Sequence, residues 1–193
     1  LKEVSPKLRL YLTPLNIDPE NPALPISGPD WFARSLADEV GLFYTQGFPE
    51  DTKALSRGVF DEDDYFSQAA MVFNERERLF HHALSRWNDG FLFFYFSSTD
   101  LNQHMYYRTI DPEHPLHDAV PTRFRRIMAE IYARADRSVG MAMELLGPDT
   151  ELLIISDHGF APFNRGFGLN SWLAAEGYAG IAFPENRNKD MFA

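Results

Sequence analysis

The sequence predicts an α/β fold in which a mostly parallel sheet is flanked by helices. Two uninterrupted apolar runs, Phe91–Phe96 and Leu152–Ile155, indicate strands that are covered on both faces. Between them, residues 122–146 carry apolar side chains at helical spacing and end before Gly147 and Pro148. A strand, a helical crossover and a second strand are typical of a parallel sheet with right-handed connections.

Composition limits the classes of protein to which the chain can belong. It has 193 residues, a net charge of −10, 45% hydrophobic residues and no cysteine. The negative charge argues against a nucleic-acid polymer as partner, and the apolar content excludes disorder. The lack of cysteine excludes disulfide scaffolds, thiolate metal sites and cysteine nucleophiles, and it fits both cytoplasm and periplasm. The apolar runs are far shorter than the roughly 20 residues of a transmembrane helix.

Residues 1–60 are expected to form a Pro-rich loop and a short helix that serve as a cap or substrate-side segment. Leu8–Thr13 alternates enough for a strand, but five prolines between positions 14 and 29 exclude regular structure there. The helix is expected over Trp31–Val40, with Asp30 as its N-cap and Gly41 as its stop.

Residues 61–193 are expected to form the metal-binding part of an α/β core. The acidic run Asp61–Asp64 is better explained as a helix start than as a cation site, because carboxylates stabilise a helix N-terminus. This helix should extend to about Trp87 and end at residues 88–90. A short capped helix is expected after Asn170 and Ser171.

Polar side chains follow both predicted strands. Asp100 and His104 come after the first strand, one helical turn apart, and Asp157 and His158 directly follow the second. Ligands bind outside the carboxyl ends of parallel strands, which lie about 4.8 Å apart, so these four side chains should share one crevice. Carboxylate and imidazole groups suit zinc, manganese and similar ions. The sequence therefore predicts a metal site.

Other residues near these motifs have two interpretations each. Thr99 or Ser98 could act as a nucleophile, but hydroxyls at strand ends more often cap the next turn. His114 and His117 could supply a third ligand or could be ordinary loop histidines. Arg165 could bind a phosphate oxygen or pair with the acidic surface.

Several motifs together resemble a known enzyme superfamily. The metal motifs are the Asp-x-x-x-His segment of Asp100 and His104 and the Ser-Asp-His-Gly-Phe segment 156–160. Further similarity lies in residues 44–47, 50–55, 98–104, 149–150, 169–173 and 176–178. These segments resemble the alkaline phosphatase superfamily, and most closely its type I phosphodiesterase/nucleotide pyrophosphatase branch.

The resemblance implies an alkaline-phosphatase-like core and a phosphoric ester hydrolase with two zinc or manganese ions. Asp100 and His104 would hold one ion, and Asp157 and His158 the other, for in-line displacement on a phosphate-ester or nucleotide-like substrate. Arg165 would contact that substrate. The exposed edges of an incomplete sheet would also favour a homo-oligomer.

The sequence departs from the family pattern in three features. An upstream aspartate, an upstream Thr or Ser nucleophile and a histidine after His158 are missing, which implies an interior piece of the enzyme. Metal binding by the isolated chain should therefore be weak or absent. Without the nucleophile, a sulfatase or a phosphomutase of the same superfamily remains an alternative. So does a catalytically incomplete α/β binding fragment.

Overall fold

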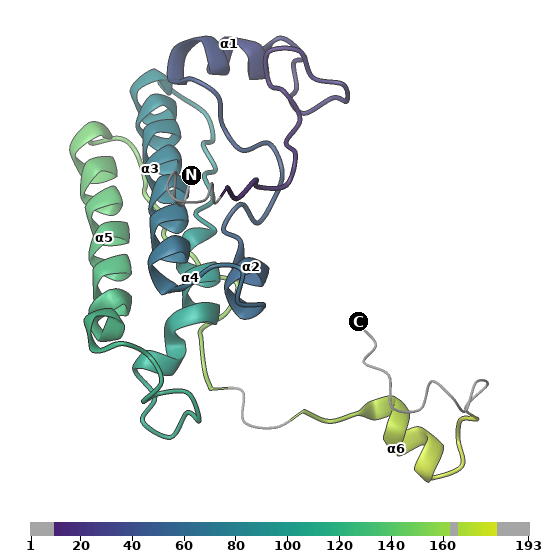
Figure 1. Cartoon of the computed structure of the whole chain (residues 1–193). Coiled ribbons are helices and arrows are strands. Elements are labelled where there is room, and N and C mark those ends of the chain that lie inside the picture. The colour runs from purple at the N-terminus through teal and green to yellow at the C-terminus, as the bar shows by residue number, and fades with distance from the viewer. Residues whose placement is uncertain (1–9, 163–165, 181–193) are drawn as a thin grey trace. The chain divides into compact units, whose positions relative to one another are not determined.

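The computed structural model describes residues 10–162 and 166–180, and it divides the chain into two compact units, Leu1–Phe160 and Ala161–Ala193. The helical elements of the first unit, shown in Figure 1, are α1 Phe32–Val40, α2 Thr52–Ser56, α3 Glu62–Arg86, α4 Ser98–Tyr106, η1 Tyr107–Thr109, η2 Thr122–Arg126 and α5 Ile127–Leu145, the η elements being 3₁₀ turns. The second unit contains α6, Leu169–Ala175.

The predicted α/β class is wrong for the residues that the structure describes, which contain helices but no strand. Phe91–Phe96 and Leu152–Ile155 have no regular secondary structure, and neither segment is hydrogen-bonded through its backbone to a neighbouring segment. Phe94 and Phe96 pack on Phe80 of α3 with ring centroids 4.9 and 5.2 Å away. Phe91 on the opposite face is 87% exposed. One helix therefore covers one face of this segment, where the prediction required cover on both.

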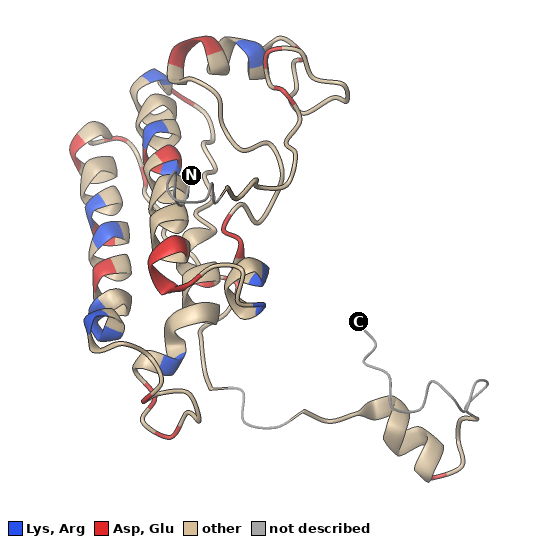
Figure 2. Ribbon diagram, in the orientation of Figure 1, with Lys and Arg blue, Asp and Glu red and all other residues tan. Residues whose placement is uncertain are grey.

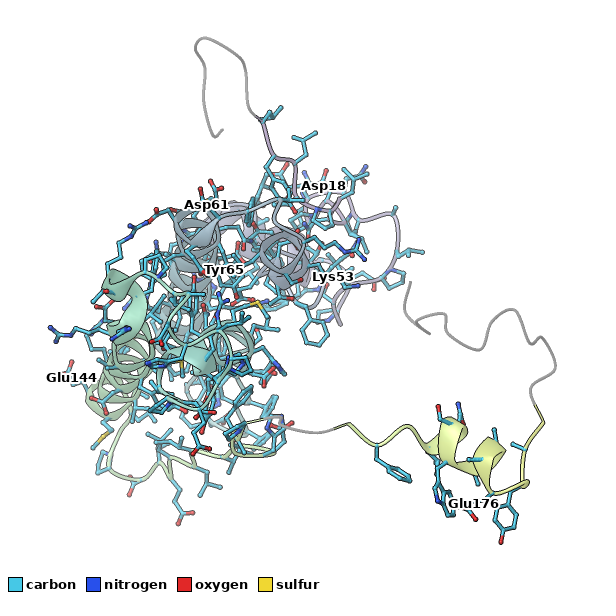
Figure 3. The ribbon with its side chains drawn as sticks, turned by 60° about the horizontal axis from the view of Figure 1, so that its bottom comes forward. Asp18, Lys53, Asp61, Tyr65, Glu144 and Glu176 are labelled. Atoms are coloured by element: carbon cyan, nitrogen blue, oxygen red, sulfur yellow. The ribbon has the colours of Figure 1, made fainter. Side chains whose placement is uncertain are left out.

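The core of the first unit lies between α3, α4 and α5. Figure 1 shows α3 and α5 side by side, and residues of all three helices are in contact. Tyr65 of α3 and Tyr106 of α4 are completely buried, with ring centroids 5.7 Å apart. Figure 3 shows Tyr65 inside this body, whereas Asp18 and Glu144 lie at its periphery. The buried cluster also contains Ala54, Phe60, Ala69, Val120, Phe124, Ile127, Met128 and Ile131.

The predicted start of the long helix is confirmed in its details. Asp61 accepts a hydrogen bond from the Asp64 backbone N–H, and the Asp64 side chain accepts one from that of Asp61. This reciprocal capping box satisfies two N–H groups that no helical carbonyl can reach. Glu62 and Asp63 form ion pairs with Arg108 and Arg123. Figure 2 shows this acidic start of α3 in red.

Other predicted elements differ from the structure at their ends. The helix expected over 122–146 begins with the 3₁₀ turn η2 and becomes α-helical at Ile127. The N-cap of α1 is Trp31 and not Asp30, and the Ser27 hydroxyl accepts a hydrogen bond from the Ala33 N–H near this end of the helix. Gly41 ends α1 with φ +83°, as the stop signal predicted.

Three further segments differ from the prediction. Residues 10–13 of the predicted strand Leu8–Thr13 have no regular structure, and the first two lie outside the described residues. The five-residue α2, capped by Asp51, was not predicted. The short helix of the second unit begins at Leu169, slightly earlier than expected. In the described ranges, no helix has the length and hydropathy that crossing a bilayer requires.

Candidate functional site

The first two predicted ligands lie on one face of α4. Asp100 stands in the first turn, where the helix dipole stabilises a negative charge, and His104 follows one turn later. His104 Nε2 lies 3.6 Å from Asp100 Oδ2, which exceeds ordinary hydrogen-bond length. The other oxygen, Asp100 Oδ1, is buried and accepts no hydrogen bond. The carboxylate thus has free acceptor capacity.

The second pair lies on the loop that follows residues 152–155. The Ser156 hydroxyl donates to the His158 carbonyl at 2.6 Å, which closes a tight turn. His158 Nδ1 lies 2.8 Å from the Gly159 carbonyl, and a carbonyl can only accept, so Nδ1 carries the proton. The lone pair of neutral His158 is therefore on Nε2, the arrangement common in metal-bound histidines.

His158 brings the loop to α4. Its Nε2 lies 3.8 Å from Asp100 Oδ1 and 3.8 Å from Asp157 Oδ2. Hydrogen bonding to the Gly159 carbonyl, and then the charge of Asp157, raise the pKa of His158. The side chain of Asp157 itself is 87% exposed. The structure therefore places His104 and His158 near the Asp100 carboxylate, and Asp157 near His158.

Phe160 is the apolar contact between this loop and α4. Its ring meets the imidazole of His104 edge to face at 5.0 Å and packs on Tyr107 at 5.2 Å. Edge-to-face contacts of this kind are favourable and directional, so Phe160 restricts the orientation of the His104 ring. The sequence suggested Phe160 only as part of a motif.

Buried polar groups support the first turn of α4. The Ser98 hydroxyl donates to Glu50 Oε1, and both residues are almost completely buried. Asn102 Nδ2 donates to the Ser98 carbonyl at 2.7 Å. Burial is the main reason that the pKa of Glu50 is raised, and the Ser98 hydrogen bond opposes the shift. In the sequence, Glu50 belongs to a segment that resembles the family, but nothing in its local sequence predicts that it is buried.

The remaining candidates are engaged elsewhere or lie outside the described residues. Burial of Ser98 removes it as an accessible nucleophile, whereas Thr99 is partly exposed. His114 Nδ1 accepts from the Leu116 N–H, and His117 Nδ1 lies 3.1 Å from the Arg108 carbonyl. Both imidazoles thus bind backbone near their own loop. Arg165 lies outside the described residues.

The groups around Asp100 have donor chemistry that metal ions use, but they do not form a metal site in this structure. Its carboxylate and the two Nε2 atoms are not bonded to one another, and one carboxylate oxygen is buried without a partner. Over the described ranges, no group of three or more histidine or acidic side chains could hold a metal ion. These residues therefore bring carboxylate and imidazole groups near one another without forming a metal site.

One family model matches the chain. Residues 22–190 match the model described as type I phosphodiesterase / nucleotide pyrophosphatase, a range that contains Asp100, His104, Asp157, His158 and Arg165. No curated protein and no solved structure matches the chain. Since the matched residues make up most of its length, the chain belongs to the type I phosphodiesterase / nucleotide pyrophosphatase family.

Proposed function

We propose that the protein is a metal-dependent phosphoric ester hydrolase in which Asp100, His104, Asp157 and His158 are metal ligands. The observation that carries this proposal is the Asp100 carboxylate, whose buried Oδ1 has no hydrogen bond while His158 Nε2 lies 3.8 Å away. A buried acceptor without a partner costs free energy, so a site that keeps one indicates that something else uses it. Family membership supports phosphate esters or nucleotides as the substrate class.

The residues of the chain would act mainly by holding donors in fixed directions. The helix fixes Asp100 and His104 relative to each other, and the Gly159 carbonyl fixes the His158 tautomer. Two divalent ions, zinc or manganese, would supply Lewis acidity and charge stabilisation for in-line displacement at phosphorus. Arg165 would contact the substrate, because a guanidinium can bind two phosphate oxygens. Ser98 takes no part as a nucleophile because its hydroxyl is buried against Glu50.

The test uses the full-length protein, depleted of metal and reloaded with zinc or manganese. Wild type should hydrolyse bis-p-nitrophenyl phosphate only when reloaded. Asp100→Asn should lose both metal and activity, because a neutral amide is a poor ligand for a divalent ion. Asp118→Asn is the matched control, since this exposed loop carboxylate pairs only loosely with Arg125, at 3.7 Å.

Three outcomes would contradict the proposal or redirect it. Hydrolysis of p-nitrophenyl sulfate in preference to the phosphodiester would indicate a sulfatase. Transfer of phosphate within the substrate instead of to water would indicate a phosphomutase. A full-length protein that takes up no metal would support the non-catalytic alternative, in which the Asp/His cluster is structural.

A further inference from the structure

We propose that Glu50 is a positioning residue that sets the first turn of α4, and with it the direction in which Asp100 presents its carboxylate. The proposal rests on the proposed function, because it assigns Glu50 to the support of the metal ligands. The side chain of Glu50 is 2% exposed and accepts a hydrogen bond from Ser98, which is completely buried. Ser98 begins α4 two residues before Asp100.

The segment that carries Glu50 is fixed to α3 on both sides. Gln68 of α3 donates from Nε2 to the Pro49 carbonyl at 2.7 Å and accepts from the Asp51 N–H at 3.1 Å. One amide side chain thus holds the residues before and after Glu50. The carboxylate of Glu50 is therefore tied to the longest helix of the unit, and not to a freely moving loop.

The connection continues into α4 on the far side of Glu50. Asn102 donates to the Ser98 carbonyl at 2.7 Å, and the Leu101 N–H donates to the Ser97 carbonyl at 3.1 Å. Tyr65 of α3 places its hydroxyl 3.4 Å from the Leu101 carbonyl. These contacts fix the residues on both sides of Asp100, so the position of Ser98 determines that of Asp100.

Stability alone gives a poor explanation for a carboxylate at this place. Its second oxygen, Oε2, is buried without a hydrogen bond, as is the Ser97 hydroxyl beside the same turn. Replacing both partners of a buried polar pair by apolar groups of similar shape is often neutral or stabilising, so stability does not require this pair. What a directed acceptor provides here is a defined orientation of the α4 N-terminus. Removal of a group that orients a metal ligand by hydrogen bonding typically changes metal affinity by about 10- to 100-fold.

The experiment measures zinc affinity of the full-length protein by competition with a chromophoric chelator, well below the unfolding midpoint of each variant. Glu50→Ala and Ser98→Ala should each weaken zinc binding by about 10-fold or more. Glu50→Gln keeps an acceptor oxygen for the Ser98 hydroxyl, so it should restore most of the affinity. The Glu50→Ala/Ser98→Ala double variant should be no weaker than the worse single variant, since both remove one hydrogen bond.

The control and the contrary outcomes separate this inference from the proposed function. Asp100→Asn must lose zinc, and if it does not, the proposed function and this inference both fail. If Asp100→Asn loses zinc while folded Glu50→Ala and Ser98→Ala bind it like wild type, only the role of Glu50 is wrong. Equal loss in Glu50→Gln and Glu50→Ala would also overturn it, because charge would then matter and not orientation. If Glu50→Ala does not fold, the zinc affinity of Ser98→Ala tests the inference, because that variant removes the same hydrogen bond.

Discussion

The Asp100 carboxylate lies near two imidazole nitrogens without hydrogen-bonding to either. His104 Nε2 is 3.6 Å from one oxygen and His158 Nε2 is 3.8 Å from the other. Both distances exceed hydrogen-bond length, as in other loose pairs of this chain such as Arg125 and Asp118 at 3.7 Å. Under the proposed function, these three groups would be the ones that a bound cation uses.

At the residue scale, the two predicted ligand pairs should be separable. In the full-length protein, His104→Ala should remove the ion assigned to Asp100 and His104, and Asp157→Asn should remove the partner ion, each with loss of phosphodiester hydrolysis. Elemental analysis of each purified variant gives the stoichiometry. His81→Ala, on the exposed side of α3, is the control. Two retained ions and full activity in Asp157→Asn would remove that residue from the ligand set.

Glu50 should also leave a signature in the pH dependence of stability. Burial raises its pKa above the ordinary value, as burial also does for Glu75. The folded state therefore keeps a proton that the unfolded state releases, so stability is highest below the unfolded-state pKa of about 4.5 and falls as pH rises through the raised folded-state pKa. Glu50→Gln should flatten part of this fall, and Glu75 should keep the rest.

Urea denaturation between about pH 4 and pH 7 measures this effect as a slope of unfolding free energy against pH. Glu113→Gln, in an exposed loop, is the matched control and should keep the slope of wild type. A Glu50→Gln slope as steep as that of wild type would mean that Glu50 stays ionised in the folded protein.

Some parts of this site could be predicted from the sequence and others could not. The spacing of Asp100 and His104 by four residues required only a helical turn, and the structure provides one. The approach of His158 to Asp100 depends on contacts between distant segments, which no local pattern encodes. Glu50 lies 48 positions before its partner Ser98, so its burial could not be read from neighbouring residues. Whether the four predicted ligands bind metal remains a prediction.

At the scale of elements, local signals identified helices well and strands poorly. Asp61–Asp64 and the apolar spacing that follows it predicted α3, because a cap and a periodic face are local properties. Phe91–Phe96 has the composition of a strand, but a strand also requires a partner, and the described residues provide a helix face for Phe94 and Phe96. The apolar run predicted a strand, and the described residues contain neither that strand nor a sheet.

The capping box of α3 should make a measurable contribution to stability. Asp61→Ala removes the side chain that accepts from the Asp64 N–H at 2.8 Å, and such substitutions cost about 1 kcal/mol. Urea denaturation of the chain should show this as a lower midpoint with an unchanged m-value. The matched control is Asp89→Ala, an exposed aspartate beyond the other end of α3, which should change stability by less than about 0.5 kcal/mol. Equal changes in the free energy of unfolding for the two substitutions would mean that the Asp61 cap does not stabilise α3.

At the scale of the whole molecule, charge and apolar exposure act in opposite directions on association. The net charge of −10 makes copies of the chain repel each other at long range. The segments 91–96 and 152–155 nevertheless expose large apolar side chains: Phe91, Phe93, Tyr95, Leu152, Leu153, Ile154 and Ile155. Exposed apolar side chains favour contact between chains, because water solvates them poorly.

Salt should decide which of these two effects is stronger. The Debye length falls from about 10 Å at 0.1 M to about 3 Å at 1 M, so salt removes the repulsion while leaving contacts at short range intact. Light scattering of the 193-residue chain should therefore show a dimer or larger assembly that grows with salt. Phe93→Ser should reduce association, whereas Met71→Ser, an exposed apolar position on α3, should not. A 22.2 kDa monomer at high salt and high protein concentration would show that these segments do not bring copies of the chain together.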